Sequence, residues 1–227
     1  SFMAKIRQLI TLGLALILIW GLGRPLGPVP PLGTLLNPFS GFWQNAEGKT
    51  PFKSGELNME GLQEEVDIIW DQNLIPHVYA NNLEDLYFAQ GYLTASLRLW
   101  QMEFQTHFAA GRLSELVGEK AIKIDQFQRR IGMPWAAERA LERALGVPST
   151  KLAMEAYSKG INQYIEELEP KDYPLEYKIL NYSPEPWTPY KTALFLKYMS
   201  WDLTGDKDDF AMSELLNRWG YDVMDEV

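Results

Sequence analysis

The side chains that could carry chemistry in this sequence are few in kind. The 227 residues include two histidines, His77 and His107, and no cysteine. The lack of cysteine excludes disulfides, thiolate nucleophiles and thiolate metal ligands, and two histidines are too few for a histidine-rich zinc site. A Ser-His-Asp triad would have to use one of them as its base. Both lie in strongly patterned segments, so we interpret each as a packed or hydrogen-bonding residue in preference to a catalyst.

The acidic charge balance of the chain argues against a nucleic-acid partner. Aspartate and glutamate number 30 against 21 lysines and arginines, which gives a net charge of −9 and a pI of about 4.8. Binding to nucleic-acid phosphates needs clustered basic residues, so we expect no nucleic-acid partner. Hydrophobic residues make up 46% of the chain, which is enough for a buried core in one or two domains.

The N-terminal segment predicts a signal anchor. Lys5 and Arg7 precede an apolar run from Leu9 to Leu22, and a basic flank before an apolar core is typical of a signal peptide or anchor. No small-x-small cleavage site is evident after the run, so we favour a retained anchor over residues 1–23 and a periplasmic or other extracytoplasmic, membrane-anchored body. The alternative, a buried core helix, is disfavoured by the basic flank. Two residues precede the first methionine and are interpreted as a cloning remnant, Ser1 and Phe2.

A linker rich in proline and glycine follows over residues 24–54. Its proline density between Arg24 and Gly33 favours an extended, semi-rigid polyproline II spacer. Three aromatic residues then stand among glycine, proline and asparagine, where they could lie on the membrane surface or pack on the folded body: Phe39, Phe42 and Trp43. The folded domain is expected to occupy residues 55–227.

The folded domain opens with a predicted β-hairpin. Glu65–Asp71 has a strand pattern, residues 72–76 form a turn, and His77–Ala80 form a second short strand. Three residues of the first strand share one face: Val66, Ile68 and Trp70. An isolated hairpin is marginally stable, and the rest of the chain has too little strand pattern to extend it. We therefore expect the hairpin to gain stability by joining a sheet made elsewhere.

From Asn82 onward the pattern is helical. Asn82 followed by Asp85 resembles a capping box with a shortened acid, and apolar residues recur at helical spacing up to Gly111. Prolines separate four further stretches that are expected to be helical, at about residues 125–145, 149–168, 190–203 and 208–219. The predicted fold class is mainly α with one β-hairpin.

Four motifs in a fixed order carry a resemblance to a known family. They are Pro76-His77 in the hairpin, Gln90-Gly91-Tyr92, Arg98-Leu99-Trp100-Gln101-Met102, and Gly111-Arg112-Leu113-x-Glu115-Leu116-x-Gly118. Together they closely resemble the start of the small subunit of the penicillin acylase (penicillin amidase) family. The resemblance extends from about Val66 to Gly220 and includes Trp187-Thr188-Pro189 and the segment from Met199 to Gly205.

The sequence departs from the family pattern at two places. Leu74 stands where the family usually has a glycine in the hairpin turn, and we expect Asn73 to supply the left-handed residue instead. Ser96-Leu97 replaces a polar-acidic pair before Arg98, which deprives that arginine of a local carboxylate. Four charged residues are interpreted as ion-pair partners that lock helices together: Arg98, Glu103, Arg112 and Glu115.

The resemblance implies an N-terminal-nucleophile hydrolase with an αββα architecture in the assembled heterodimer, in which the hairpin completes a sheet of the partner subunit. In this family a precursor cuts itself and exposes a serine at the start of a larger second chain. That serine attacks a linear N-acyl amide with its own α-amino group as base, which titrates near ~7.7–8.0, and an oxyanion hole stabilises the intermediate. No catalytic residue is then expected on this chain. Its partners would be the large subunit and a small N-acyl amide, with β-lactams and acyl-homoserine lactones both open.

The resemblance also assigns substrate contacts to one helix end. Met199 and Leu203 fall on apolar positions of the acyl pocket, and Asp202 falls where some members place a gating arginine. An acid there would disfavour anionic acyl groups. Without the resemblance, a methionine and a leucine four residues apart are more simply interpreted as core.

A calcium ion shared with the large subunit is the cofactor that the resemblance implies. Counted forward from Met199, its ligand from this chain falls on Asp209, within the acidic run Gly205–Asp209, and calcium prefers several carboxylate oxygens. The alternative is that Asp206 or Asp208 caps the following helix. A different reading of the whole chain, as a non-catalytic membrane-anchored helical adaptor, also remains open at this point.

Overall fold

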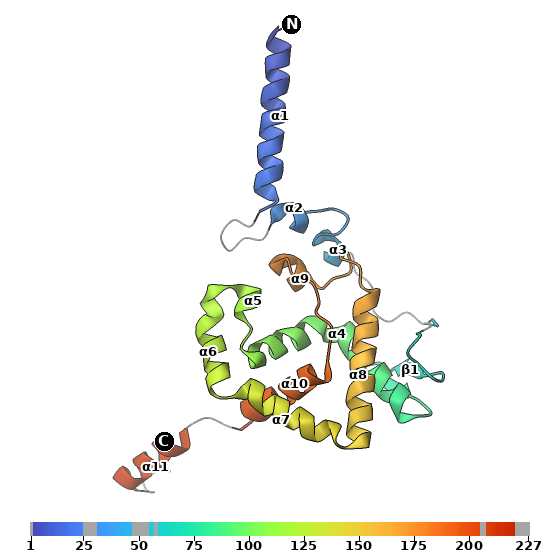
Figure 1. The fold of residues 1–227 in the computed structure, drawn as a ribbon, viewed down its shortest axis with the longest axis vertical. Coiled ribbons are helices and arrows are strands. Elements are labelled where there is room, and N and C mark those ends of the chain that lie inside the picture. The colour runs from blue at the N-terminus through green and yellow to red at the C-terminus, as the bar shows by residue number, and fades with distance from the viewer. Residues whose placement is uncertain (1, 25–30, 47–54, 57–58, 205–207, 221–227) are drawn as a thin grey trace.

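The structure is a computed structural model that describes the chain except residues 1, 25–30, 47–54, 57–58, 205–207 and 221–227. The first helix, α1 (Phe2–Leu22), projects away from the body as a single rod (Figure 1). Its residues Met3–Leu22 have a mean hydropathy of 1.6 and are not buried against the rest of the protein. By length and composition this helix could cross a membrane. An N-terminal signal sequence has the same length and composition.

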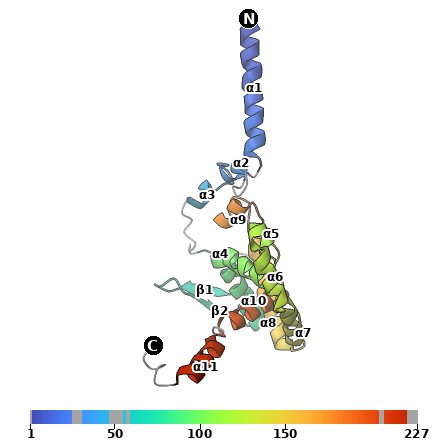
Figure 2. The ribbon, with the colours of Figure 1, turned by 90° about the vertical axis from the view of Figure 1, so that its left-hand side faces the viewer.

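Two short helices lie within the linker over residues 24–54, and most of the stretch expected to be extended, residues 25–30, lies outside the described part of the chain. They are α2 (Leu32–Leu35) and α3 (Trp43–Ala46). Both views place them between the end of α1 and helix α9 (Leu175–Leu180) of the body (Figures 1 and 2). The side chains of Phe42 and Trp43 contact one another, with ring centroids 4.1 Å apart, while Phe39 is exposed.

The predicted hairpin is confirmed. β1 (Asp67–Trp70) pairs antiparallel with β2 (Pro76–Tyr79), with Ile68 opposite Val78. The face predicted for the first strand is the less exposed one, and it holds Val66, Ile68 and Trp70. Among the described residues no third strand joins this pair, and the opposite face leaves Ile69 and Tyr79 exposed. Completion of a partner's sheet stays a prediction.

The turn of the hairpin corrects one expectation. Leu74, and not Asn73, adopts the left-handed conformation, with φ 60°. The carboxylate of Asp71 accepts hydrogen bonds from the backbone N–H groups of Asn73 (2.8 Å) and Ile75 (2.9 Å), and the Leu74 N–H donates to the Asp71 carbonyl (3.0 Å). These hydrogen bonds to Asp71 hold Leu74 in the left-handed conformation. Leucine, which is not branched at Cβ, tolerates this conformation, although glycine would adopt it without strain.

Helix α4 (Leu83–Ala110) begins and ends where the sequence predicts. Asn82 is its N-cap and accepts from the Asp85 N–H at 2.8 Å, and Gly111 ends it in the left-handed conformation with φ 64°. The Asp85 carboxylate does not close the capping box on the backbone of Asn82. It accepts from the N–H groups of Gln63 (2.8 Å) and Glu64 (2.9 Å) and so ties the segment before the hairpin to the helix.

The packing of α4 on α8 (Pro148–Glu167) forms the centre of the body. The two helices cross at glycines. A Cβ on Gly91 would collide with the Tyr157 carbonyl, and one on Gly160 would collide with the Phe88 carbonyl. Only the lack of a side chain at both positions lets the backbones approach this closely. The body core beside this crossing contains Ala95, Leu99, Met102, Ile161, Tyr177 and Trp187.

Three of the remaining helices differ from expectation. The stretch predicted as one helix over 125–145 is two, α6 (Ile122–Arg130) and α7 (Met133–Leu145), because Gly132 adopts φ 78° between them. Helix α9 was not predicted. The others are α5 (Ser114–Val117), the 3-10 turn η1 (Glu119–Ala121), α10 (Pro189–Asp202) and α11 (Asp208–Trp219). Viewed from the side, α4 to α10 form a thin layer from which the hairpin projects (Figure 2). The mainly α class with one hairpin is thus confirmed.

Candidate functional site

The three residues predicted to contact substrate lie together at the C-terminal end of α10. Met199 is partly buried, whereas Asp202 and Leu203 are exposed, Leu203 to 73%. The Leu203 N–H donates to the Met199 carbonyl at 3.0 Å, so positions 199 and 203 lie on one side of the last turn. The interpretation of Leu203 as a core residue of this chain is therefore wrong. The substrate role of all three stays a prediction.

The predicted calcium ligand cannot be placed at side-chain level. Asp209 lies in the first turn of α11, but its side chain, like residues 205–207, lies outside the described part of the chain. The same holds for the alternative capping residues Asp206 and Asp208. The calcium assignment therefore stays a prediction from sequence.

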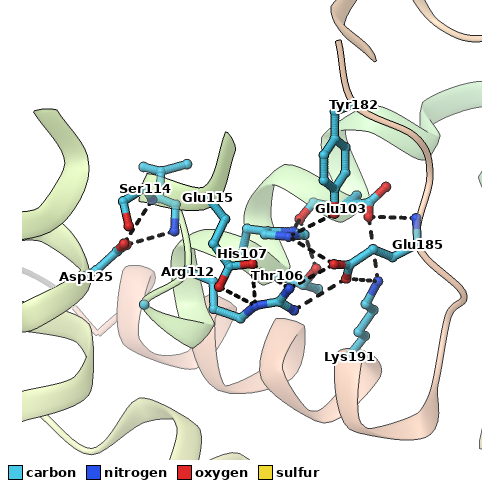
Figure 3. A network of polar contacts seen from close by, with 12 residues as sticks. Glu103, Thr106, His107, Arg112, Ser114, Glu115, Asp125, Tyr182, Glu185 and Lys191 are labelled. Atoms are coloured by element: carbon cyan, nitrogen blue, oxygen red, sulfur yellow. Dashed lines mark hydrogen bonds and ion pairs between the residues drawn. The ribbon is translucent and has the colours of Figure 1, made fainter. Parts of the chain in front are cut away.

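A buried polar cluster is built on α4 (Figure 3). Glu103 and His107 lie one helical turn apart and are both only 1% exposed. The Glu103 carboxylate accepts hydrogen bonds from the Tyr177 hydroxyl and from the Glu185 N–H, the latter at 3.0 Å. It therefore connects α4 to α9 and to the segment that leads into α10.

Glu185 is the second carboxylate of this cluster. Arg112 donates to both of its oxygens, at 2.8 and 3.3 Å, and the Lys191 ammonium lies 3.1 Å from Oε2. Arg112 also holds Glu115 through a pair of short bonds. Burial acts to raise the pKa of Glu185, but the hydrogen bonds from Arg112 and Tyr182 and the charge of Lys191 outweigh it and hold that pKa at about 2.

His107 is packed inside this cluster, as predicted. Its Nδ1 lies 3.0 Å from the Glu103 carbonyl oxygen, which only accepts, so Nδ1 carries the proton. Its Nε2 then faces the Tyr182 hydroxyl at 3.4 Å and the Glu185 carboxylate at 3.7 Å. The Tyr182 ring stands edge-on to the imidazole. The imidazole thus bridges α4 and the segment before α10.

The cluster does not have the character of a metal centre. One ligand atom from each of Glu103, His107 and Glu185 lies within 4.8 Å of the others, a spacing that could hold an ion. Arg112 and Lys191 already supply two positive charges to the two carboxylates. A divalent cation would have to displace Lys191, which is itself buried, so the residues present do not fit calcium here.

A pocket of about 840 Å³ opens beside this cluster. Its wall includes His107, Arg112, Glu185 and Lys191 on one side and residues of α6 and α7 on the other, among them Arg129, Trp135 and Glu138. The cations lining it are already engaged, since Arg129 donates to the Gly111 carbonyl at 2.9 Å. None of the predicted substrate residues lines it.

The described part of the chain contains no serine-histidine pair. His107 contacts Tyr182 and two glutamates, and His77 lies on the hairpin 3.5 Å from Asp71. Neither histidine is hydrogen-bonded to a serine or threonine hydroxyl there. A Ser-His-Asp triad requires that contact, so the described residues do not form one.

Sequence reasoning recognised part of the buried cluster and missed the rest. Glu103, Arg112 and Glu115 were expected to form ion pairs and do, whereas for Arg98 no ion pair is found among the described residues. Arg98 instead marks a break in α4, with φ −152° and ψ 31°. Glu185, Lys191 and Tyr182 were missed. The available signal was Glu103, which stands one helical turn before His107 in a helix that is otherwise rich in apolar residues.

Comparison with known proteins places the chain in a family. The penicillin amidase profile matches residues 65–227. Penicillin acylase 2 proenzyme of Pseudomonas sp. (strain SE83) is 35% identical over 147 residues, which is 65% of this chain and 18% of that protein. Acyl-homoserine lactone acylase QuiP of Pseudomonas aeruginosa is 32% identical over 175 residues, or 77% of this chain and 20% of that protein.

A solved structure agrees in fold. Thermostable penicillin G acylase from Alcaligenes faecalis superposes with a TM-score of 0.57 at 23% identity, over 70% of this chain and 86% of the matched chain. The chain spans about a fifth of the length of the curated relatives that it matches. The match of the family profile to most of the chain, from the hairpin onward, decides the assignment: this chain belongs to the penicillin amidase family.

Proposed function

We propose that this chain is the small-subunit part of a penicillin-acylase-like amidohydrolase. The enzyme hydrolyses a linear N-acyl amide with an N-terminal serine, which belongs to a larger subunit. That serine is activated by its own α-amino group, whose pKa lies near working pH. The contribution of this chain is to line the acyl pocket, to add a ligand to a calcium site and to tether the enzyme to a membrane.

One observation carries the proposal. The family profile covers residues 65–227, yet neither histidine is hydrogen-bonded to a serine or threonine hydroxyl in the described part of the chain. Membership of a family of amide hydrolases and the lack of such a pair are both explained if the reactive group belongs to a companion chain. The two-stranded hairpin, whose exposed face carries Ile69 and Tyr79, supports such a companion because a lone hairpin gains stability by joining a larger sheet.

The end of α10 is the proposed contact with substrate. Leu203 is exposed to 73% and Met199 is partly buried, so apolar surface stands free at the position that the family uses for acyl groups. Asp202 lies between them and is exposed. Its carboxylate would repel an anionic acyl group, which favours neutral acyl chains.

Calcium is proposed as a structural ion at the junction with the large subunit. Asp209 would be the ligand from this chain, and the neighbouring carboxylates of Asp206 and Asp208 match the oxygen chemistry that calcium prefers. When bound, the ion would neutralise acidic side chains brought together from the two chains.

The membrane tether is proposed for α1. Its residues Met3–Leu22 are mostly apolar and are not buried inside the protein, and Lys5 and Arg7 mark the end that remains in the cytoplasm. The body then lies on the extracytoplasmic side, in the periplasm, where small N-acyl compounds can reach it.

Hydrolysis of matched amides tests the reaction. The assembled enzyme would be incubated with phenylacetyl, glutaryl and long-chain acyl amides of one chromogenic amine, and amine release would be followed. We expect release from neutral acyl amides, with the glutaryl compound the slowest of the set. Release from none of them, by protein that is otherwise folded, would contradict the proposal and favour a non-catalytic adaptor.

A further inference from the structure

An apolar cluster near the end of α1 is not accounted for by amide hydrolysis. Three large side chains are exposed: Leu36 to 47%, Phe39 to 81% and Trp43 to 51%. We refer to these three residues as the collar. Single exposed apolar residues are ordinary, but several in one short stretch indicate a surface that contacts something apolar.

The length of α1 fixes where the collar would lie relative to a bilayer. Met3–Leu22 comprises 20 residues, and at 1.5 Å per residue such a helix is about 30 Å long, which equals the hydrocarbon thickness of a bilayer. If the helix spans, Leu22 lies at the boundary with the headgroups. The Arg24 guanidinium lies 4.2 Å above the Trp20 ring at this same end, and both residue types concentrate at the membrane interface.

The chain returns to this boundary directly before the collar. Gly33 of α2 lies against the end of α1, because a Cβ on Gly33 would stand 3.1 Å from the Leu22 carbonyl oxygen and 3.7 Å from the Leu22 Cβ. Both views place α2 immediately beside the end of α1 (Figures 1 and 2). The collar therefore begins at the level where the apolar helix ends.

Hydrogen bonds tie the collar segment to the body. The Lys178 ammonium on α9 donates to the Gly41 carbonyl (3.1 Å) and to Asn45 Oδ1 (2.7 Å). The Asn45 amide donates in turn to the Tyr173 carbonyl at 2.9 Å. A ligand that holds Phe39 and Trp43 therefore also holds α9 and the layer of helices behind it.

We propose that the collar inserts among the phospholipid headgroups and seats the body against the membrane surface. This inference rests on the proposed tether. Aromatic side chains suit the headgroup region because their rings are apolar enough to leave water yet tolerate a polar boundary. The occupant is a lipid surface in preference to a protein, because the collar is continuous with the end of the one helix in the described chain that could span a membrane.

Lipid-phase quenching of a label on the collar tests this proposal. The assembled enzyme, with α1 present, would be reconstituted into phosphatidylcholine vesicles that contain headgroup-level nitroxide lipid. The chain has no cysteine, so F39C and, as a second collar position, W43C can each carry a fluorophore. Enzyme without an introduced cysteine, treated with the same fluorophore, gives the background emission. The matched control is W135C on α7, an aromatic position that is exposed to 63%. We expect loss of emission at positions 39 and 43 and none above background at position 135.

Each other result would overturn the proposal. Enzyme that is recovered in vesicles but whose label at position 39 responds to an aqueous quencher, and not to lipid, would refute the collar while leaving the tether intact. A label shielded from both quenchers would show that protein, such as the large subunit, covers this surface. Enzyme that is absent from the vesicles would refute the tether and the collar together, while amide hydrolysis is measured separately in solution.

Discussion

Replacement of Glu103 by alanine is the most informative perturbation of the buried cluster. The carboxylate is 1% exposed and holds the Tyr177 hydroxyl, the Glu185 N–H and, at 3.7 Å, the Lys191 ammonium. Its loss leaves two buried donors without an acceptor, each costing about 1–3 kcal/mol, and weakens the pairing of a buried cation. Because such terms are not additive, we expect about 3–6 kcal/mol of destabilisation in E103A.

The matched control for E103A is E115A. Glu115 also pairs with Arg112, at 2.7 Å, but its side chain is 48% exposed, and exposed ion pairs contribute only about 0–1 kcal/mol. Urea unfolding of the assembled enzyme would compare the two. With an m-value of about 2 kcal/mol/M, the midpoint should fall by about 1.5–3 M in E103A and by less than about 0.5 M in E115A.

Equal midpoints for E103A and E115A would refute the reasoning, because burial would then make no difference to the energetics of the cluster. If E103A fails to accumulate, E103Q keeps the shape and one acceptor oxygen. E103Q should then fold with a urea midpoint below that of E115A. An E103Q protein that also fails to fold while E115A is unaffected would still locate the sensitivity at the buried carboxylate.

Four further outcomes follow from the described geometry. Both side-chain amide atoms of Gln128 are buried without a hydrogen-bond partner. Q128L should therefore raise the free energy of unfolding by about 1–3 kcal/mol and increase the urea midpoint. An unchanged or lower midpoint would contradict this and point to a buried water that bonds the amide. The depressed pKa of Glu185 (about 2, against an ordinary 4.5) stabilises the fold above pH 4.5, and this contribution is lost as pH falls toward 2. E185Q should therefore show a flatter decline of the urea midpoint over that window, and a slope identical to that of the unaltered enzyme would contradict this. G91A and G160A should each cost about 1–3 kcal/mol or more, because a Cβ would strike the facing backbone; normal thermal unfolding of either would refute the close crossing. D202N should raise kcat/KM for the glutaryl amide relative to the phenylacetyl amide by about two- to fivefold, whereas an unchanged ratio would remove that residue from the acyl pocket.

Local sequence signals predicted the parts of the fold that local forces determine. The start of α4 at Asn82 and its end at Gly111 follow from capping chemistry carried by one or two residues. The hairpin follows from alternation in β1 and a turn before β2. The turn conformation was mispredicted because Asp71, three residues earlier, forces Leu74 into the left-handed region.

The parts that were missed depend on contacts distant in sequence. Glu185 and Lys191 join Glu103 across about eighty residues of chain, and no spacing rule connects them. Helix α9 is short and is held by Lys178 and by the burial of Tyr177, not by an apolar repeat. The division between α6 and α7 required knowing that Gly132 takes a positive φ.

The companion chain is the central claim, and intact mass measures it most directly. This chain would be tagged, purified from the membranes of its host under non-denaturing conditions, and analysed by intact-mass and N-terminal sequencing of every species present. The account predicts a second, larger chain in equal amount whose first residue is serine, or threonine or cysteine as an alternative nucleophile. Recovery of this chain alone as a stable, folded monomer would contradict it.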